Sequence, residues 1–307
     1  MITYILTGGT IGSSIGEDGI ARPTADVSRL IADDSQLRVP YNILSENLDG
    51  KHLNLLIEET AAVIKEGVSE GIIITHGSDT LQYSAAMLDM VFSGADLPIV
   101  LVAANYVLTD ARSNGKANLY FAQRFIKEKR SNGIFVCYKN DGEAVKIHRG
   151  RDVLPHEAFS DALKSVGGSC FAEYCYDKDM SAAVYKQNGT ESRDDRYIGS
   201  IPVLDDPGCV LRIEPYPGMV YPVIGNGVKA VLLGSYHSGT VGIGDDLKCF
   251  LSAAKDKGID VYLCGLSRAG TEYESISTYD ELGINAIYDV SPVYAYCMLW
   301  LKYSTAR

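Results

Sequence analysis

Two short turns rich in glycine and hydroxyl groups are the first candidates for chemistry in this sequence. Thr7-Gly-Gly-Thr10 follows the apolar run Ile2–Leu6, and His76-Gly-Ser-Asp-Thr80 follows the apolar run Gly71–Thr75. Glycine lets a backbone approach a ligand closely, and free N–H groups in such turns can hold an oxyanion. The hydroxyl groups beside such N–H donors make both turns candidates for binding or stabilising a negatively charged oxygen.

Strands that alternate with helices must position these turns. The predicted strands are Ile2–Leu6, Gly71–Thr75, Pro98–Ala103 and Gly133–Tyr138, and the predicted helices are Leu53–Ile64, Leu81–Phe92 and Asn118–Lys127. This alternation indicates βαβ units and a parallel sheet, and near-continuous apolar strands indicate that helices cover both faces. In such a sheet, ligands bind outside the carboxyl ends of the strands, where both turns are expected.

A polar, turn-rich stretch divides the chain. The sequence predicts a larger N-terminal domain over residues 1–187, an interdomain linker over 188–208 and a smaller C-terminal domain over 209–307. The elements expected in the smaller domain are strands Val210–Ile213, Ala230–Gly234 and Val261–Cys264, with helices Asp245–Lys257 and Pro292–Lys302. The predicted fold class is α/β, with a larger doubly wound, mainly parallel sheet domain and a smaller C-terminal α/β domain.

Composition and charge exclude several classes of partner. The formal net charge is −11, which argues against nucleic acid and anionic membrane surfaces as main partners. No apolar stretch is long enough to span a membrane, and Met1–Leu6 has no basic run typical of a signal peptide. The seven cysteines lack zinc-type spacing and are interpreted as reduced thiols of a cytoplasmic protein.

The two turns also carry a resemblance to a known family. Leu6-Thr-Gly-Gly-Thr-Ile11 and Ile74-Thr-His-Gly-Ser-Asp-Thr80 resemble the two signatures of the bacterial-type L-asparaginase/glutaminase family, with serine in the second where the family usually has threonine. Their separation of about 65 residues is also similar. Weaker similarity covers nearly the whole chain, in the segments Ser113–Leu119, Gly150–Val153, Leu233–Gly239 and Pro292–Leu301.

The resemblance implies an amidohydrolase without a metal or organic cofactor, which converts asparagine, and often glutamine, to the acid and ammonia. It implies Thr10 as the nucleophile, and Ser78 and Asp79 as members of a second hydroxyl–lysine–aspartate group. Asp79 would also bind the α-ammonium group of a small amino-acid substrate. Ser45 and Glu46 match a substrate-contacting pair. A homodimer or homotetramer is expected, in which a neighbouring subunit's smaller domain helps to close the site.

Each of these residues has a purely structural alternative. Thr10 could cap the next helix, and Asp79 could cap the helix that starts near Thr80. Ser78 could be a turn residue only, and Glu46 could be a solvated loop carboxylate. His76, between strand and turn, is interpreted as a structural hydrogen-bonding residue.

Two expected side chains are missing from the family pattern. The catalytic lysine should follow Gly150–Val153, but Pro155 occupies the expected position and His156 lies beside it; Lys146 and Lys164 lie too far away along the chain. His156 could exchange a proton near neutral pH, or it could be an ordinary loop residue.

The second missing side chain is the tyrosine of a glycine-containing lid. The segment Gly16–Pro23 contains none, and Ile20 takes its place. Further departures are Thr240, where asparagine is common, and Val293, which replaces an acidic residue.

Several functional hypotheses follow. The first is an asparaginase-like amidohydrolase that uses a threonine nucleophile, with L-asparagine as the first substrate to test. The alternative is a catalytically weak or inactive family member that binds an acidic or amide amino acid, because the two side chains are missing. A third is a protein that takes part in amide transfer, against which the absence of a tRNA-binding domain and of a basic patch counts. A dinucleotide-binding fold is disfavoured, because Gly8–Gly12 does not match GxGxxG.

Overall fold

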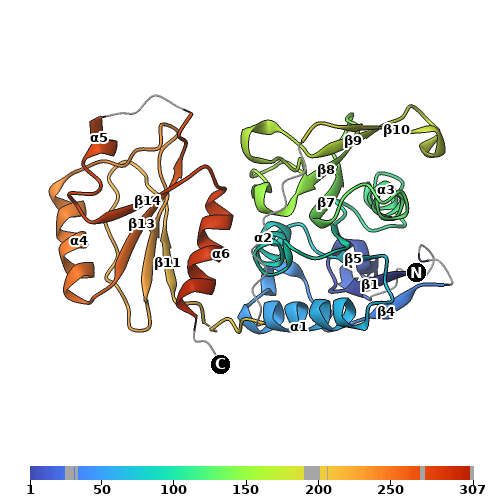
Figure 1. Ribbon diagram of the computed structural model, residues 1–307, viewed down its shortest axis with the longest axis horizontal. Coiled ribbons are helices and arrows are strands. Elements are labelled where there is room, and N and C mark those ends of the chain that lie inside the picture. The colour runs from blue at the N-terminus through green and yellow to red at the C-terminus, as the bar shows by residue number, and fades with distance from the viewer. Residues whose placement is uncertain (25–30, 32–33, 190–200, 206, 270–273, 305–307) are drawn as a thin grey trace. The chain divides into compact units, whose positions relative to one another are not determined.

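The computed structural model contains two compact units, Met1–Pro202 and Val203–Arg307 (Figure 1). It describes residues 1–24, 31, 34–189, 201–205, 207–269 and 274–304. Most of the predicted linker over 188–208 lies outside these residues, so its bounds stay a prediction. The units are described separately.

A mixed sheet forms the centre of the larger unit. Among the described residues it has eight strands in the order β10-β9-β8-β7-β6-β5-β1-β4. The parallel strands are β1 (Ile2–Leu6), β4 (Gln36–Arg38), β5 (Gly71–Thr75), β6 (Pro98–Val102) and β7 (Gly133–Lys139). The antiparallel extension consists of β8 (Val145–Arg149), β9 (Ala172–Cys175) and β10 (Val184–Gln187). A hairpin of β2 (Ser13–Ile15) and β3 (Ala21–Pro23) lies outside this sheet.

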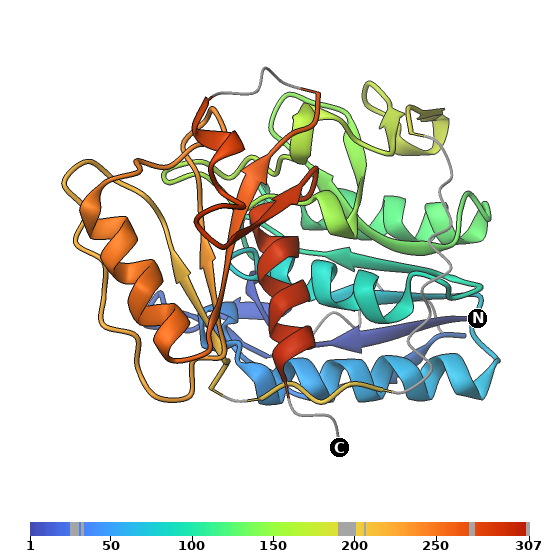
Figure 2. The same ribbon diagram turned by 60° about the vertical axis from the view of Figure 1, so that its left-hand side comes forward.

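Helices cover both faces of this sheet, which confirms the predicted fold class. They are α1 (Gly50–Glu66), α2 (Leu81–Phe92) and α3 (Gly115–Lys127), and Figure 2 shows α1 running alongside the strands. Alternate strand residues point to opposite faces. Tyr4, Ile73 and Val100 accordingly share one core with Phe121 and Phe125 of α3.

Helix α1 illustrates why these residues form a helix with these bounds. Its N-cap residue, Asp49, accepts a hydrogen bond from the backbone N–H of His52 at 3.0 Å. Leu53, Leu56 and Ile57 form its buried stripe. The helix ends at Gly67, whose φ of 67° is a left-handed conformation that favours glycine.

A buried asparagine joins the carboxyl ends of two strands. Asn118 of α3 donates from Nδ2 to the carbonyl oxygen of Ala103 at 2.8 Å, and its Oδ1 accepts from the N–H of Lys139 at 2.8 Å. Ala103 follows β6 and Lys139 ends β7. The side chain therefore fixes the sheet edge at which ligands are expected.

We expect Asn118→Ala to lower the free energy of unfolding by about 2–4 kcal/mol, because two backbone groups lose their partner in a buried place. Lys116→Ala, an exposed substitution on the same helix, should change it by less than about 0.5 kcal/mol. Denaturant unfolding measures both values. Equal effects of the two substitutions would contradict the role given to Asn118.

The smaller unit is a second sheet with its own core. Its four strands in the described residues lie in the order β11-β12-β13-β14 and are parallel. They are β11 (Val210–Ile213), β12 (Ala230–Leu233), β13 (Asp260–Leu266) and β14 (Ile284–Tyr288). The helices are α4 (Asp245–Asp256), the short α5 (Glu274–Ser277) and α6 (Pro292–Tyr303), and Figure 1 shows α4 and α6 on opposite sides of the sheet.

Candidate functional site

The two glycine-rich turns follow the carboxyl ends of the adjacent strands β1 and β5. The register of β1 and β5 pairs Leu6 with Thr75, so that Thr7 and His76 both follow the last paired residues. The hydroxyl of Thr7 donates to the carbonyl oxygen of Thr75 at 2.7 Å and ties the two strand ends together. The turns therefore meet at the carboxyl edge of the sheet, as predicted from the parallel arrangement.

Glycine is required where the two turns touch. Gly9 has φ 76° and ψ 176°, a conformation that is essentially restricted to glycine. A Cβ on Gly9 would lie 2.3 Å from the backbone nitrogen of Gly77, and one on Gly77 would lie 2.4 Å from Ser45 Oγ. The first turn, the second turn and the segment that contains Ser45 are thus in direct contact.

Ser45 and Asp79 meet at this contact. Ser45 begins the short 3-10 helix η3 (Ser45–Asn47), and its buried hydroxyl donates to Asp79 Oδ2 at 2.9 Å. The carbonyl oxygen of Ser45 accepts from the Thr80 hydroxyl at 2.8 Å. Backbone hydrogen bonds between Ile43 and the first turn hold the preceding segment in place, from the Gly9 N–H at 3.0 Å and to the Thr7 carbonyl at 3.1 Å.

The other predicted site residues lie at the same edge with different exposure. Thr10 begins the 3-10 helix η1 (Thr10–Gly12) and is half-buried, as is Ser78. Asp79 and Glu46 are exposed. The structure joins Ser45 to Asp79, whereas Glu46 makes no hydrogen bond with another described residue. The role of Glu46 stays a prediction.

The capping alternatives find no support in the described residues. The N-cap of η1 is Gly9, so Thr10 lies inside the helical turn and does not cap it. The N-cap of α2 is Thr80, and no side chain makes a capping hydrogen bond there. Asp79 is therefore available at the edge of the sheet with Ser45 as its partner.

His76 is a structural residue, as its place between strand and turn indicated. It is buried, with Nδ1 at 2.9 Å from the Gly77 carbonyl oxygen and Nε2 at 2.8 Å from Ser84 Oγ. A carbonyl oxygen can only accept, so Nδ1 carries the proton and Nε2 accepts from the serine hydroxyl. Burial lowers the pKa of His76, so both ring nitrogens are committed in the neutral form.

The segment expected to carry a lysine packs beside α2. It begins with η4 (Gly150–Asp152), and Leu154 donates to the carbonyl oxygen of Lys164 at 3.0 Å. Lys164 pairs with Glu157 at 2.8 Å, and Lys146 pairs with Glu143. Both flanking lysines are thus engaged with glutamates of their own surroundings.

The packing around His156, in the same segment, could not be predicted from residue spacing in the sequence. Its ring lies 5.8 Å from the Tyr138 ring, centroid to centroid. Both ring nitrogens are buried, and neither makes a hydrogen bond of normal geometry with a described residue. Burial lowers the pKa of His156, and the Ala162 backbone, Asp161 and Asp79 act in the opposite direction.

The predicted lid is an antiparallel hairpin in this structure. Arg22 and Asp18 pair at 2.7 Å across its end, and Gly19 adopts a φ of 76°. Ile20, at the place of the missing tyrosine, is 55% exposed. The hairpin follows η1 directly, so the segment after Thr10 is short and tied back on itself.

A polar cavity lies along the same edge of the sheet. Its volume is about 760 Å³, and Asn105, Asn140, Asp161 and Ala162 are among the residues that line it. Asn105 follows β6 and Asn140 follows β7. The surroundings of His156 therefore open onto a polar space.

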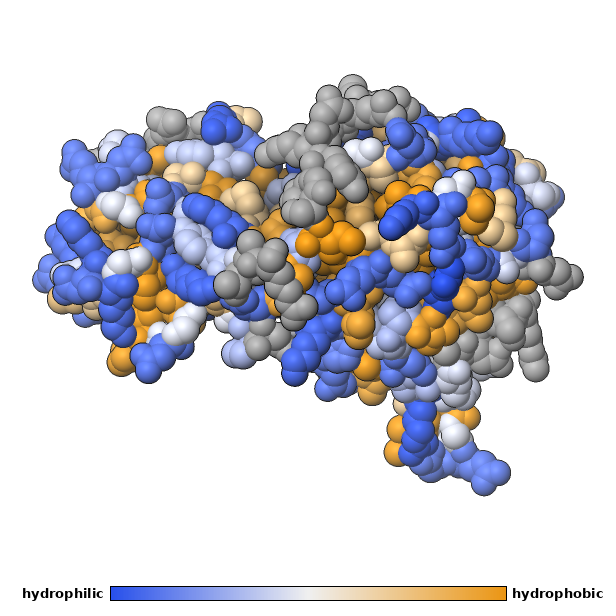
Figure 3. Space-filling model, turned by 60° about the horizontal axis from the view of Figure 1, so that its bottom comes forward, coloured by the Kyte–Doolittle hydropathy of each residue, from blue (hydrophilic) through white to orange (hydrophobic). Residues whose placement is uncertain are grey.

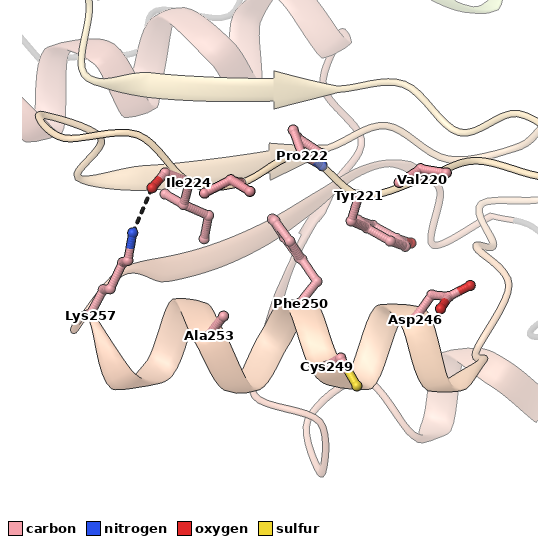
Figure 4. Close-up of a pocket in the computed structure, with 10 residues that line it drawn as sticks. Val220, Tyr221, Pro222, Ile224, Asp246, Cys249, Phe250, Ala253 and Lys257 are labelled. Atoms are coloured by element: carbon pink, nitrogen blue, oxygen red, sulfur yellow. Dashed lines mark hydrogen bonds between the residues drawn. The ribbon is translucent and has the colours of Figure 1, made fainter.

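A second groove, in the smaller unit, is apolar. Figure 4 shows it between the segment Val220–Ile224 and α4, with a volume of about 370 Å³. Tyr221 stacks on Phe250 with ring centroids 4.9 Å apart. None of the described residues that line this groove carries a serine or threonine hydroxyl. It therefore lacks the serine or threonine hydroxyl predicted as the nucleophile for amide chemistry.

The next three findings concern the surface, membrane-spanning helices and possible metal ligands. Figure 3 shows one face of the molecule, on which hydrophilic residues are spread among hydrophobic ones. In the part of the chain that the structure describes, no helix is both long and apolar enough to cross a membrane. The same residues contain no group of three or more His, Cys, Asp or Glu side chains that could hold a metal ion.

The fold and the site define an α/β protein with hydroxyl and carboxylate groups at the carboxyl ends of two adjacent parallel strands. Residues 1–186 match the model of the N-terminal domain of the asparaginase family, and the chain belongs to that family. An L-asparaginase structure from Thermococcus kodakarensis has a TM-score of 0.75 at 21% identity, covering 100% of this chain and 94% of that one.

Curated relatives include components of a different enzyme, glutamyl-tRNA(Gln) amidotransferase. One component of this enzyme from Methanopyrus kandleri is 30% identical over 178 residues, which are 54% of this chain and 39% of that protein. The component of the same name from Pyrococcus furiosus is 27% identical over 274 residues, 85% of this chain and 61% of that protein. The chain thus covers less than two thirds of the length of these two relatives.

Proposed function

We propose that this protein is an amidohydrolase that hydrolyses the side-chain amide of a small amino acid, with L-asparagine as the first candidate. The observation that carries the proposal is the contact between the two glycine-rich turns, since Thr10 directly follows Gly9 and the Ser45–Asp79 pair flanks Gly77. Membership of the asparaginase family supports it. The proposed site residues are Thr10, Ser78, Asp79, Ser45 and Glu46.

The proposed reaction has two steps. The hydroxyl oxygen of Thr10 forms a bond to the amide carbon, and the hydroxyl proton is transferred to the amide nitrogen as the carbon–nitrogen bond breaks and ammonia leaves. Water then attacks the resulting ester, which releases the acid and restores the hydroxyl. Backbone N–H groups of the glycine-rich turns would stabilise the oxyanion in both steps.

Substrate recognition would use the exposed carboxylate. An amino acid carries a fixed α-ammonium group, and Asp79 could bind it through a charge-assisted hydrogen bond. The hydrogen bond from Ser45 fixes one oxygen of Asp79 and leaves the other for the ligand. Glu46 would add a second negative charge at the same end of the substrate.

A coupled ammonia-release assay tests this proposal. The purified protein is given L-asparagine, D-asparagine and L-glutamine in parallel, beside the Thr10→Ala variant. We expect turnover of at least one amide, with L-asparagine fastest. No release above the variant with any amide, together with a thermal shift caused by L-aspartate, would refute hydrolysis and support a family member that only binds amino acids.

A second candidate function is ammonia supply to a partner enzyme. It is favoured by the relatives named as amidotransferase components, which share 27–30% identity with this chain. Such a protein would release ammonia from glutamine in preference to asparagine, and only when its partner is present. L-glutamine in the assay above, with and without an amidotransferase partner, distinguishes the two functions.

We expect Ser45→Ala to raise KM for the amide substrate about 10-fold and to change kcat less, because Asp79 loses the hydrogen bond that orients it. Ser131→Ala is the matched control, because Ser131 lies far from the turns in sequence and, within the described part of the chain, its hydroxyl bonds only to the adjacent Asn132 carbonyl. Steady-state kinetics of both variants give the values. An unchanged KM in Ser45→Ala would separate Ser45 from substrate binding.

A further inference from the structure

We propose that His156 is the proton-transfer residue of this site. It accepts the hydroxyl proton of Thr10 while the carbon–oxygen bond forms, and it returns that proton to the amide nitrogen while the carbon–nitrogen bond breaks. His156 packs against Tyr138, which lies near the carboxyl end of β7, at the same edge of the sheet as the turn of Thr10, and a water molecule would carry the proton between the two side chains. This inference rests on the proposed function.

The reaction needs a group that can gain and lose a proton near neutral pH, and histidine is the side chain suited to that. His76 lies at the same edge of the sheet, but both of its ring nitrogens are bonded, to the Gly77 carbonyl and to the Ser84 hydroxyl. The flanking Lys146 and Lys164 pair with glutamates. Neither ring nitrogen of His156 has such a commitment among the described residues.

Several contacts hold His156 in its position. Its segment is held at both ends, because Val153 forms a bridge with Ser165 and Asn140 accepts from the Leu163 N–H at 2.8 Å. The Tyr138 ring packs against the imidazole, and the Tyr138 hydroxyl donates to the Asp161 carbonyl oxygen at 3.1 Å. Two buried ring nitrogens without partners carry a desolvation cost, which a functional role explains.

The charged groups around His156 favour its neutral form without fixing it there. Asp79 at the start of α2 and Asp161 in the same segment both raise its pKa, as does the Ala162 backbone, and burial lowers it by more than they raise it. The ring is therefore neutral at pH 7 and can accept a proton. When a substrate ammonium group pairs with Asp79, the imidazole loses part of that negative field and stays neutral until the reaction starts.

Kinetics of three variants test the inference. His156→Gln keeps a polar side chain of similar size but cannot exchange a proton, and kcat should fall on the order of 10²–10⁴-fold with KM changed by less than about 3-fold. His52→Gln is the control, since His52 pairs with Asp49 at the start of α1. Binding of L-aspartate, measured by calorimetry, shows that His156→Gln is folded and keeps its site.

The pH profile, recorded with the third variant, gives an independent readout that a merely structural role would not move. The acidic limb of kcat/KM should report protonation of His156. Asp161→Asn removes an exposed charge that raises this pKa, while the backbone contact with Tyr138 remains, so the limb should move to lower pH.

Either of two outcomes would overturn the proposal. The first is a kcat of His156→Gln within about 3-fold of that of the unsubstituted protein. The second is an acidic limb of the kcat/KM pH profile that stays at the same pH in Asp161→Asn. The pH profile of Asp161→Asn tests the proposal even if His156→Gln does not fold. Absence of turnover in the unsubstituted protein itself would instead refute the proposed function, and with it this role of His156.

Discussion

The Thr10→Ala variant is expected to lose amide turnover by on the order of 10⁴-fold or more while it still binds L-aspartate. The loss is large because, in the proposed reaction, Thr10 supplies the oxygen that forms the covalent bond, and alanine has no hydroxyl group. Binding should survive, because Ser45 and Asp79 keep their hydrogen bond. Ammonia release measures turnover, and calorimetry measures the binding of L-aspartate.

Thr10→Ser is the matched control for this experiment. It keeps the hydroxyl and removes only a methyl group, so turnover should fall far less than in Thr10→Ala. If Thr10→Ala kept more than about a tenth of the turnover, another residue would be the nucleophile, and the proposed mechanism would be wrong.

Gly9→Ala should lower the free energy of unfolding by about 3–5 kcal/mol and abolish activity. An alanine there would occupy a conformation that only glycine adopts readily, and its Cβ would lie 2.3 Å from the backbone nitrogen of Gly77. Backbone cannot move aside as a flexible side chain can. The two turns would separate, and the position of Thr10 relative to the second turn would change. Thermal and denaturant unfolding measure the loss.

Gly19→Ala is a control for a substitution at positive φ without a close contact. Gly19 has the same φ of 76°, but a Cβ there would meet no atom within 4 Å. We expect a cost of about 1 kcal/mol, from the left-handed backbone alone. Equal costs at both positions would show that the contact between Gly9 and Gly77 adds nothing to stability.

The regular elements of the parallel region could be predicted from sequence because each has a strong, local pattern. β5 is a buried β-branched run, and α2 follows it with the bounds expected for Leu81–Phe92. The extension β8–β9–β10 was not predicted. Its strands are four or five residues long and mix polar with apolar positions, so their pairing depends on neighbours that are distant in sequence.

The site was predictable to the extent that strand ends are predictable. The rule for parallel sheets brings the turns of Thr10 and Asp79 to one edge, and the register of β1 with β5 places them at one level. The environment of His156 could not be predicted. It depends on Tyr138 of β7 and on Asp161 of the same segment, and neither has a sequence spacing that signals proximity to a histidine.

The pairing of β1 with β5 also determines when the site can exist during biosynthesis. β1 emerges from the ribosome long before β5, yet Leu6 has its partner only in Thr75. Until β5 and the turn after it have been synthesised, the turn that carries Thr10 lacks its contact with Gly77. Contacts between segments so far apart in sequence form slowly, so in a nascent chain Thr10 is present before the second turn has packed against the first. The proposed reactivity of Thr10 therefore depends on the completed tertiary structure.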